Sequence, residues 1–284
     1  MRIPLSLLVC VGLSSLLGLS ACKKETVFVE DNEAPTANHV PRVKIENYVN
    51  RLFIDLLGRE PIDAELETET QALKDLQLSK EARQALIQKL QSATDFVIGD
   101  TSYTQAFHWH LYKLAKARCL EGQSDGTILG FGDAEDGRSQ AVVDARRQLQ
   151  GDSIGIHELF ARMVDNGLFD FINMNSFNFV NATFDNLLWR FPSQNEFSAG
   201  FAMVEHNQSA GLFGQAGQNK SDFIQIITQS REMFEGLIIW VYQQWLSRPP
   251  SSVETAALID DFYQHRDIKK VLLEVLASDE YAGF

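Results

Sequence analysis

Two distant stretches of the chain carry the same helix–turn–helix pattern, and this repetition narrows the possible folds more than any other feature. Residues 52–65 read LFIDLLGREPIDAE, and residues 241–254 read VYQQWLSRPPSSVE. The aligned pairs are Phe53 and Tyr242, Leu57 and Leu246, Arg59 and Arg248, Pro61 and Pro250, and Glu65 and Glu254. A pattern that recurs within one chain indicates a repeated supersecondary unit.

The first copy begins with apolar residues that follow the period of a helix. They recur at spacings of three and four, at Ile45, Tyr48, Val49, Leu52, Phe53, Leu56 and Leu57. These spacings place them on one face of a helix. The helix should end at Gly58, which can adopt the left-handed conformation, and Pro61 cannot continue the hydrogen-bond ladder. A second helix is expected from about Lys80 through Leu90, capped by Ser79.

The second copy predicts the same plan with one difference. Ser247 stands where the first copy has Gly58, and Ser251 and Glu254 have the spacing of a capping box. The copies are predicted to span about residues 45–96 and 237–284. We therefore expect a mainly α, multi-helical globular domain that contains a duplicated helical hairpin.

The amino terminus has the pattern of an exported lipoprotein. Arg2 precedes an apolar stretch that runs from Ile3 to Leu17, and small residues follow it. This order is typical of a secretory signal, and the stretch is shorter than the roughly 20 residues of a membrane-spanning helix. The motif LSAC at residues 19–22 resembles the lipobox of bacterial lipoproteins, which implies that Cys22 becomes the acylated first residue.

The chain is therefore predicted to have three parts. Residues 1–21 form a lipoprotein signal peptide, and residues 22–43 carry the lipidated Cys22 and a flexible tether, because charge and proline occur there without periodicity. Residues 44–284 form the helical domain. Lys23 stands where lipoproteins retained at an inner membrane often carry aspartate, so the resemblance implies an outer-membrane lipoprotein that is anchored to the membrane through its N-terminal lipid.

Composition excludes one large class of partners. Acidic residues outnumber basic ones by 38 to 25, and the formal net charge of -13 opposes binding to nucleic acid and to anionic lipid. Cys119 is the only cysteine of the predicted domain, so an intramolecular disulfide is not expected there, and we interpret Cys119 as a small buried apolar residue. No cofactor is predicted.

The middle of the chain is rich in asparagine and phenylalanine. Residues 171–191 read FINMNSFNFVNATFDNLLWRF. Part of this segment can be interpreted as an edge strand, but asparagine is poor in strands, and Phe184, Leu187, Leu188 and Phe191 fit a helix better. The following residues 209–223 contain three glycines and are predicted to be a loop. Aromatic rings beside amides suit recognition, so the segment rich in asparagine and phenylalanine is expected to supply the recognition surface. The alternative is that the rings belong to the core and that the amides cap helices.

Several of these segments together resemble a known group of domains. NRLFIDLLGREPIDAEL at residues 50–66 and FHWHLYKLAKAR at residues 107–118 resemble the helical domain of unknown function of planctomycete-type cytochrome-associated proteins. FDFINMNSFNFVNATFDNLLWRF at residues 169–191 and SAGLFGQAG at residues 209–217 are similar to companion domains of those proteins. The resemblance implies a helical fold outside the cytoplasm and no catalytic residue. This chain lacks their Cys-x-x-Cys-His motif, which excludes covalent haem of that type.

Two groups of residues are candidate metal sites. His108 and His110 lie in a helix-like stretch, where a separation of two residues points side chains about 200° apart, so hydrogen-bonded structural histidines are the favoured alternative to metal ligation. His110 is expected near the buried stripe and His108 on the other side. Residues 125–137 contain the possible calcium ligands Asp125, Asp133, Glu135 and Asp136. Their spacing does not match an EF-hand, and a solvated acidic loop is the alternative.

No catalytic motif is found. Ser209 lies near His206 and Glu205 in sequence, but it lacks the Gly-x-Ser-x-Gly pattern of a nucleophile elbow. The sequence therefore predicts an extracytoplasmic lipoprotein that is a binding or scaffold component of an envelope complex, with an envelope protein as its partner. The alternative is an envelope enzyme, a hydrolase or a redox accessory protein, whose site is assembled from residues distant in sequence.

Overall fold

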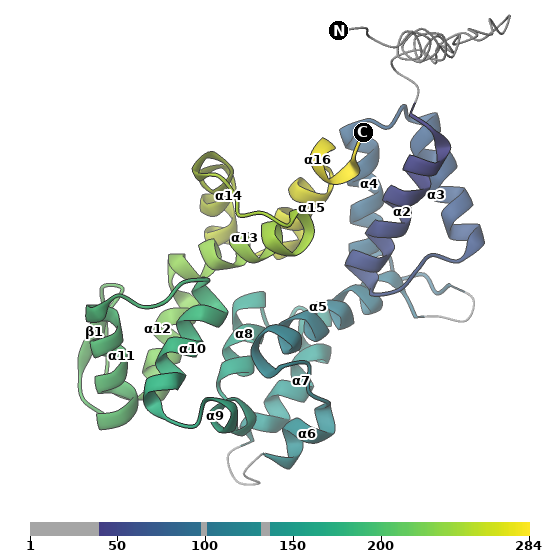
Figure 1. The fold of residues 1–284 in the computed structure, drawn as a ribbon. Coiled ribbons are helices and arrows are strands. Elements are labelled where there is room, and N and C mark those ends of the chain that lie inside the picture. Colours follow the sequence, from purple (N-terminus) through teal and green to yellow (C-terminus); the bar gives the residue numbers. More distant parts are fainter. Residues whose placement is uncertain (1–39, 98–100, 132–136) are drawn as a thin grey trace, which may run out of the picture. The chain divides into compact units, whose positions relative to one another are not determined.

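The computed structural model describes residues 40–97, 101–131 and 137–284, and this part of the chain is mainly helical, as predicted (Figure 1). The helices before the middle of the chain are α2 (Arg42–Leu57), α3 (Asp63–Asp75), α4 (Lys80–Ser92), α5 (Tyr103–Leu120), α6 (Asp125–Gly130), α7 (Arg138–Gln150), α8 (Ile156–Val164) and α9 (Gly167–Asn173). They are followed by α10 (Ser176–Leu188), α11 (Gln194–His206), β1 (Ala210–Leu212), β2 (Gln215–Gly217), α12 (Lys220–Gln229), α13 (Arg231–Leu246), α14 (Ser252–His265), α15 (Ile268–Leu276) and α16 (Asp279–Ala282).

The first two predicted helices are confirmed. All seven residues of the apolar stripe in α2 are buried, and Gly58 ends the helix with a φ of 71° in the left-handed region. The hydroxyl of Ser79 accepts a hydrogen bond from the Ala82 N–H at the start of α4. The helix α2 begins at Arg42, so the predicted end of the tether at residue 43 is slightly too late.

The helix α3 between them was not predicted. Its sequence is DAELETETQALKD, and its only fully buried apolar side chain is Leu73. Its other buried residues include Glu65 and Glu69, whose carboxylates bind Arg59 and Lys89. A helix whose buried face consists largely of paired charges has a weak hydrophobic period, so sequence analysis does not detect it.

Three turns in the described part of the chain have the same geometry, including the two that were aligned by sequence. In each turn a left-handed residue ends one helix, and an arginine then binds the glutamate in the first turn of the next helix through two N–H groups. The left-handed residues are Gly58, Trp189 and Ser247, and the ion pairs are Arg59–Glu65 at 2.8 and 2.9 Å, Arg190–Glu196 at 2.9 and 2.6 Å, and Arg248–Glu254 at 3.0 and 2.6 Å.

In the second and third of these turns a further glutamate binds the same arginine. Glu232 binds Arg190 and Glu280 binds Arg248, and each glutamate lies in a helix capped by the serine two positions before it. In the first turn, the hydroxyl of Tyr103 donates to Glu65 instead, at 2.8 Å. The turn at residues 187–196 was not predicted, because its sequence LLWRFPSQNE differs from the other two at the aromatic positions 189 and 191.

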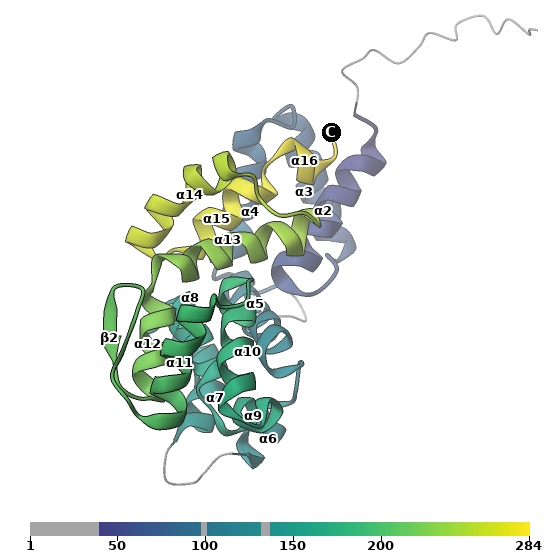
Figure 2. The same ribbon diagram turned by 60° about the vertical axis from the view of Figure 1, so that its left-hand side comes forward.

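The first and last helices of the described chain pack against each other. The hydroxyl of Tyr48 donates to the Leu276 carbonyl at 3.1 Å, and Arg51 donates to the Trp245 carbonyl at 2.8 Å. The hydroxyl of Tyr281 donates to Asp55 at 2.7 Å. Figures 1 and 2 both show α4 beside α15 and α16. Residues at opposite ends of the sequence are therefore joined in one compact unit, which comprises Val40–Phe284.

The middle segment is helical, and two details of its prediction are wrong. Asn175 caps α10, which confirms a helix rather than a strand, but Phe191 lies beyond this helix and is 71% exposed. The predicted loop after α11 contains a short antiparallel hairpin of β1 and β2, with Phe213 and Gly214 at positive φ in its turn. A two-residue turn of this kind joins the two strands of a hairpin. The strands are too short to show an alternating pattern in the sequence, so the hairpin was not predicted.

Candidate functional site

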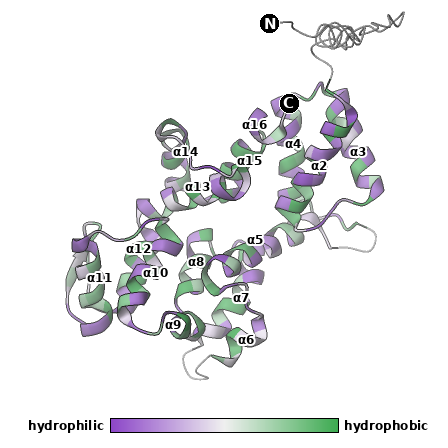
Figure 3. Cartoon of the chain, in the orientation of Figure 1, coloured by the Kyte–Doolittle hydropathy of each residue, from purple (hydrophilic) through white to green (hydrophobic). Residues whose placement is uncertain are grey.

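Exposed apolar side chains occur at the end of α6, along α9 and at the start of α10. Phe171 is 64% exposed, Met174 79%, and Phe177 58%, and the ring of Phe131 lies 4.6 Å from that of Phe171. In Figure 3 the helix α9 is among the most hydrophobic segments of the chain. We call Phe131, Phe171, Met174 and Phe177 the Met174 surface. Exposed apolar clusters of this kind mark interaction sites more often than isolated apolar residues do.

The backbone at the centre of this surface is strained. Met174 has a φ of 56° and a ψ of -33°, and the Asn175 N–H donates to the Asn173 carbonyl at 2.6 Å. These angles are close to those of a γ-turn, which is rare and unfavourable for a residue with a side chain. The turn is forced because Asn173 ends α9 and Asn175 already caps α10. Met174 is therefore held outward between two helix ends.

Polar groups surround the Met174 surface. Lys220 forms an ion pair with Asp170, and the hydroxyl of Ser176 donates to Glu205. A small hollow of about 220 Å³ lies beside Met174, and its lining includes Asp170, Ser176 and Lys220 together with Phe179 and Val204. The combination of exposed apolar side chains and a paired polar rim is the usual composition of a protein-binding surface.

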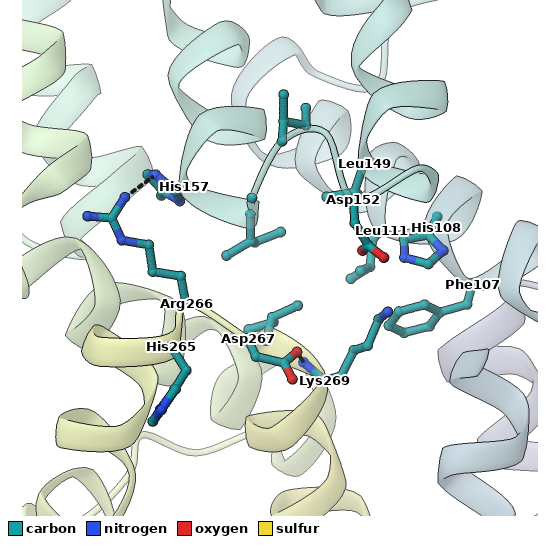
Figure 4. Close-up of a pocket in the computed structure, with 14 residues that line it drawn as sticks. Phe107, His108, Leu111, Leu149, Asp152, His157, His265, Arg266, Asp267 and Lys269 are labelled. Atoms are coloured by element: carbon teal, nitrogen blue, oxygen red, sulfur yellow. Dashed lines mark hydrogen bonds between the residues drawn. The ribbon is translucent and has the colours of Figure 1, made fainter.

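A larger cavity lies at a different place, between α5, the connection from α7 to α8, and the turn from α14 to α15. Its volume is about 480 Å³, which is within the range of small-molecule sites. Figure 4 shows Arg266 and His157 on one side of the cavity, with His108 and Asp152 on the other. Apolar side chains of Leu111, Leu149, Ile154, Ile156 and Ile268 complete its wall.

The structure separates the two histidines that sequence analysis considered together. His108 is buried and lines the large cavity, where its Nδ1 lies 2.6 Å from the Thr104 carbonyl. His110 is only partly buried, and its ring packs against Gly58 in another hollow. The prediction that His110 is the more buried of the two is wrong, because the connection from α7 to α8 covers the face of α5 that carries His108.

The acidic candidates are described only in part. Asp125 lies in the first turn of α6, where its carboxylate accepts hydrogen bonds from Lys116 and from the Tyr112 hydroxyl. The other three predicted calcium ligands, Asp133, Glu135 and Asp136, lie outside the described residues, as does Cys22. Among the described residues, no group of three or more His, Cys, Asp or Glu side chains is placed to hold a metal ion.

Other residues singled out by sequence are structural. Cys119 is fully buried, and this burial raises the pKa of its thiol to about 12, so the thiol stays protonated at neutral pH. Glu205 binds Ser176 on the neighbouring helix. The contact between Arg266 and His157 was missed, because the two residues are 109 positions apart and no motif connects them.

Three buried or partly buried histidines make the fold sensitive to acid. Burial is the main cause that lowers the pKa of His108, His157 and His110, with the pKa of His110 at about 4. The unfolded chain therefore binds protons near pH 6.5 that the folded chain binds only at lower pH. The contribution of these histidines to the free energy of unfolding is therefore fully present above pH 6.5. It is lost as the pH falls towards the pKa values that the histidines have in the folded chain.

We expect His110→Gln to weaken this dependence on pH. The free energy of unfolding of the wild type should fall by about 2 kcal/mol between pH 6.5 and pH 4 on account of His110, after allowance for its partial exposure. Urea unfolding at a series of pH values measures this fall. The variant should lose stability less steeply over the same interval, and an equal slope in both proteins contradicts the role of His110.

Comparisons with known proteins add no relative to this description. No protein-family model matches the chain, no curated protein matches it, and no solved structure matches it. Within the described residues, no helix has the length and apolar character needed to cross a membrane.

Proposed function

We propose that this chain is a membrane-anchored lipoprotein outside the cytoplasm, acting as a binding or scaffold component of an envelope complex. Its partner is an envelope protein that receives Met174 and the neighbouring rings in an apolar groove. The observation that carries this proposal is the strained, exposed Met174 between Phe171 and Phe177. A long apolar side chain in an unfavourable backbone conformation is a cost to the isolated protein, and binding to a partner explains why it is kept.

The chemistry of this surface favours a protein over a lipid bilayer. The net charge of -13 repels anionic headgroups. The cations beside the surface, Lys220 and Arg138, are already paired with the carboxylates of Asp170 and Asp165. Methionine adapts its shape to a groove, and aromatic rings contribute large contact areas in the cores of protein interfaces. The lipid of Cys22 provides the membrane attachment in this proposal, so the Met174 surface is free to contact another protein.

Site-specific photocrosslinking tests the partner in cells that produce the full chain. A photoreactive residue at position 174 should give a discrete protein crosslink, whereas one at position 191 should not, because Phe191 is equally exposed but lies at the other end of α10. Phe171→Ser should reduce the crosslink at position 174 about tenfold or more, as expected for an interface hot spot. Crosslinks to lipid alone, or equal crosslinks at both positions, contradict the proposal.

Met174→Gly provides a second test, in which stability and binding change differently. Glycine adopts positive φ without strain, so the variant should unfold at the same temperature as the wild type or slightly above it. Its binding to the crosslinked partner should nevertheless fall about tenfold. A variant that loses stability and binding together shows instead that Met174 has a structural role.

The membrane anchor is tested separately. Cys22→Ala should give an unprocessed or unlipidated precursor that is no longer extracted with the outer-membrane fraction, because the acyl chains provide the attachment. Mass spectrometry of the mature amino terminus measures acylation directly. Recovery of mature wild-type protein without acyl chains refutes the anchor, and it leaves the result at the Met174 surface unaffected.

A further inference from the structure

The guanidinium group of Arg266, an exposed residue that lines the large cavity, has no carboxylate partner in the described part of the chain. Among the described residues, Arg266 forms no ion pair, and its Nη1 lies 2.8 Å from Nε2 of His157. A guanidinium group only donates hydrogen bonds, so Nε2 must be the acceptor. The proton of the neutral imidazole is therefore on Nδ1. The contact orients the guanidinium group but leaves its positive charge available to a ligand.

This orientation of His157 is unfavourable by itself. His157 is 6% exposed, and its Nδ1 is buried with no hydrogen-bond partner among the described residues. The ring turns back over the start of α8, where a Cβ on Gly155 would lie 2.8 Å from Nδ1. A buried donor without an acceptor costs free energy. The fold accepts this cost at the residue that fixes the guanidinium group of Arg266, which indicates a use for that group.

The other charges of the cavity define what it can hold. The helices α8 and α15 both begin at its wall, so their amino-terminal N–H groups add partial positive charge. The ammonium group of Lys269 also has no ion pair among the described residues. Three carboxylates oppose these groups. Glu158 accepts from the Gly155 N–H at 2.6 Å at the start of α8. Asp267 caps α15 by accepting from the Lys269 N–H at 3.0 Å, and Asp152 lies on the opposite wall beside His108.

We infer that this cavity binds a small monocarboxylate with an apolar body. The carboxylate is held by Arg266, which His157 positions, and the body lies on the side chains of Leu111, Ile156 and Ile268. Arginine matches the planar geometry of a carboxylate. A dianion such as phosphate fits less well, because Asp152 and Asp267 line the same cavity and repel a second negative charge.

Isothermal titration calorimetry of the full mature chain at pH 7 tests this inference with three probes. The probe 3-methylbutanoate should bind saturably and at least tenfold more tightly than 3-methylbutanamide, which has the same shape without the charge. It should also bind at least tenfold more tightly than inorganic phosphate. The inference is overturned if the amide binds as tightly as the carboxylate, or if phosphate binds more tightly than the carboxylate. It is also overturned if the carboxylate shows no binding at a 50-fold molar excess over the protein.

Variants assign the roles of the two residues. Arg266→Asn should reduce affinity at least tenfold, and asparagine suits the φ of 58° at this position, so the protein should remain folded. Lys270→Gln removes a charge from the same segment but not from the cavity wall, so affinity should be unchanged. His157→Leu should weaken binding, whereas His157→Gln, which restores an acceptor for Arg266, should keep it. Equal effects of Arg266→Asn and Lys270→Gln overturn the inference.

Discussion

Replacing Gly236 by alanine is expected to lower the free energy of unfolding by about 3 kcal/mol. Gly236 lies within α13, where it faces the end of α10. A Cβ at this position would lie 2.2 Å from the carbonyl oxygen of Leu187 and 2.9 Å from the Cα of Leu188. These are backbone atoms, so a change of side-chain rotamer cannot relieve the overlap.

The consequence extends to the neighbouring turn. Leu187 and Leu188 end α10 immediately before the turn closed by Arg190, and Glu232 of α13 binds this arginine. Separation of α10 from α13 would therefore disturb the apolar contact and the ion pair together. The better helix propensity of alanine offsets at most about 1 kcal/mol of the loss.

Gly126→Ala is the matched control. Gly126 also lies within a helix, α6, and the nearest atom to a Cβ there is the hydroxyl of Ser124 at 3.8 Å. This variant should be as stable as the wild type or slightly more stable. Urea unfolding at pH 7 compares the three proteins. If Gly236→Ala is as stable as Gly126→Ala, then α10 and α13 do not pack as closely as described.

The second large effect is expected for Gly58→Ala, which should lower the free energy of unfolding by about 2–3 kcal/mol. Gly58 has a φ of 71°, and a Cβ there would lie 2.5 Å from Nδ1 of His110. The equivalent positions of the other two turns hold Trp189 and Ser247 at φ values of 55° and 56°. Their side chains show that the left-handed conformation alone does not require glycine. The close approach of His110 distinguishes the first turn.

A double-mutant cycle separates the two causes. In a His110→Ala background, Gly58→Ala should cost only the backbone strain, so the two substitutions should be coupled by about 1 kcal/mol or more. Ser247→Ala provides the comparison for a turn without this contact, and its effect should be small. Additive effects of Gly58→Ala and His110→Ala contradict the explanation and leave the left-handed conformation as the whole cause.

The local signals of the sequence predicted the elements that depend on local chemistry. The stripe from Ile45 to Leu57 is buried as a whole, and the caps at Gly58, Ser79 and Ser251 are present. Helix caps and periodicity involve neighbours within a few residues, so the sequence carries them directly. The helix α3 escaped prediction because its buried face contains Glu65 and Glu69, whose partners come from other segments.

The sequence predicted which segment carries a recognition surface but not which of its side chains are exposed. The composition of the segment rich in asparagine and phenylalanine predicted recognition there, but composition does not distinguish the exposed Phe171 and Phe177 from the buried Phe179 and Phe184. Packing of α10 against α11 and α13 decides which rings are covered. Asn166 and Asn175 cap α9 and α10, whereas the amides of Asn173 and Asn181 donate to backbone carbonyls one turn earlier in their own helices.

The sequence by itself determined the helical class, the ends of several helices and the repeated turn, because each depends on chain neighbours or on a period along one face. Tertiary structure alone decided the ion pair between Arg190 and Glu232 at the second turn, the burial of His108 rather than His110, and the contact of Arg266 with His157. These features join residues far apart in sequence. Their partners are fixed by how the helices pack, which no local pattern records.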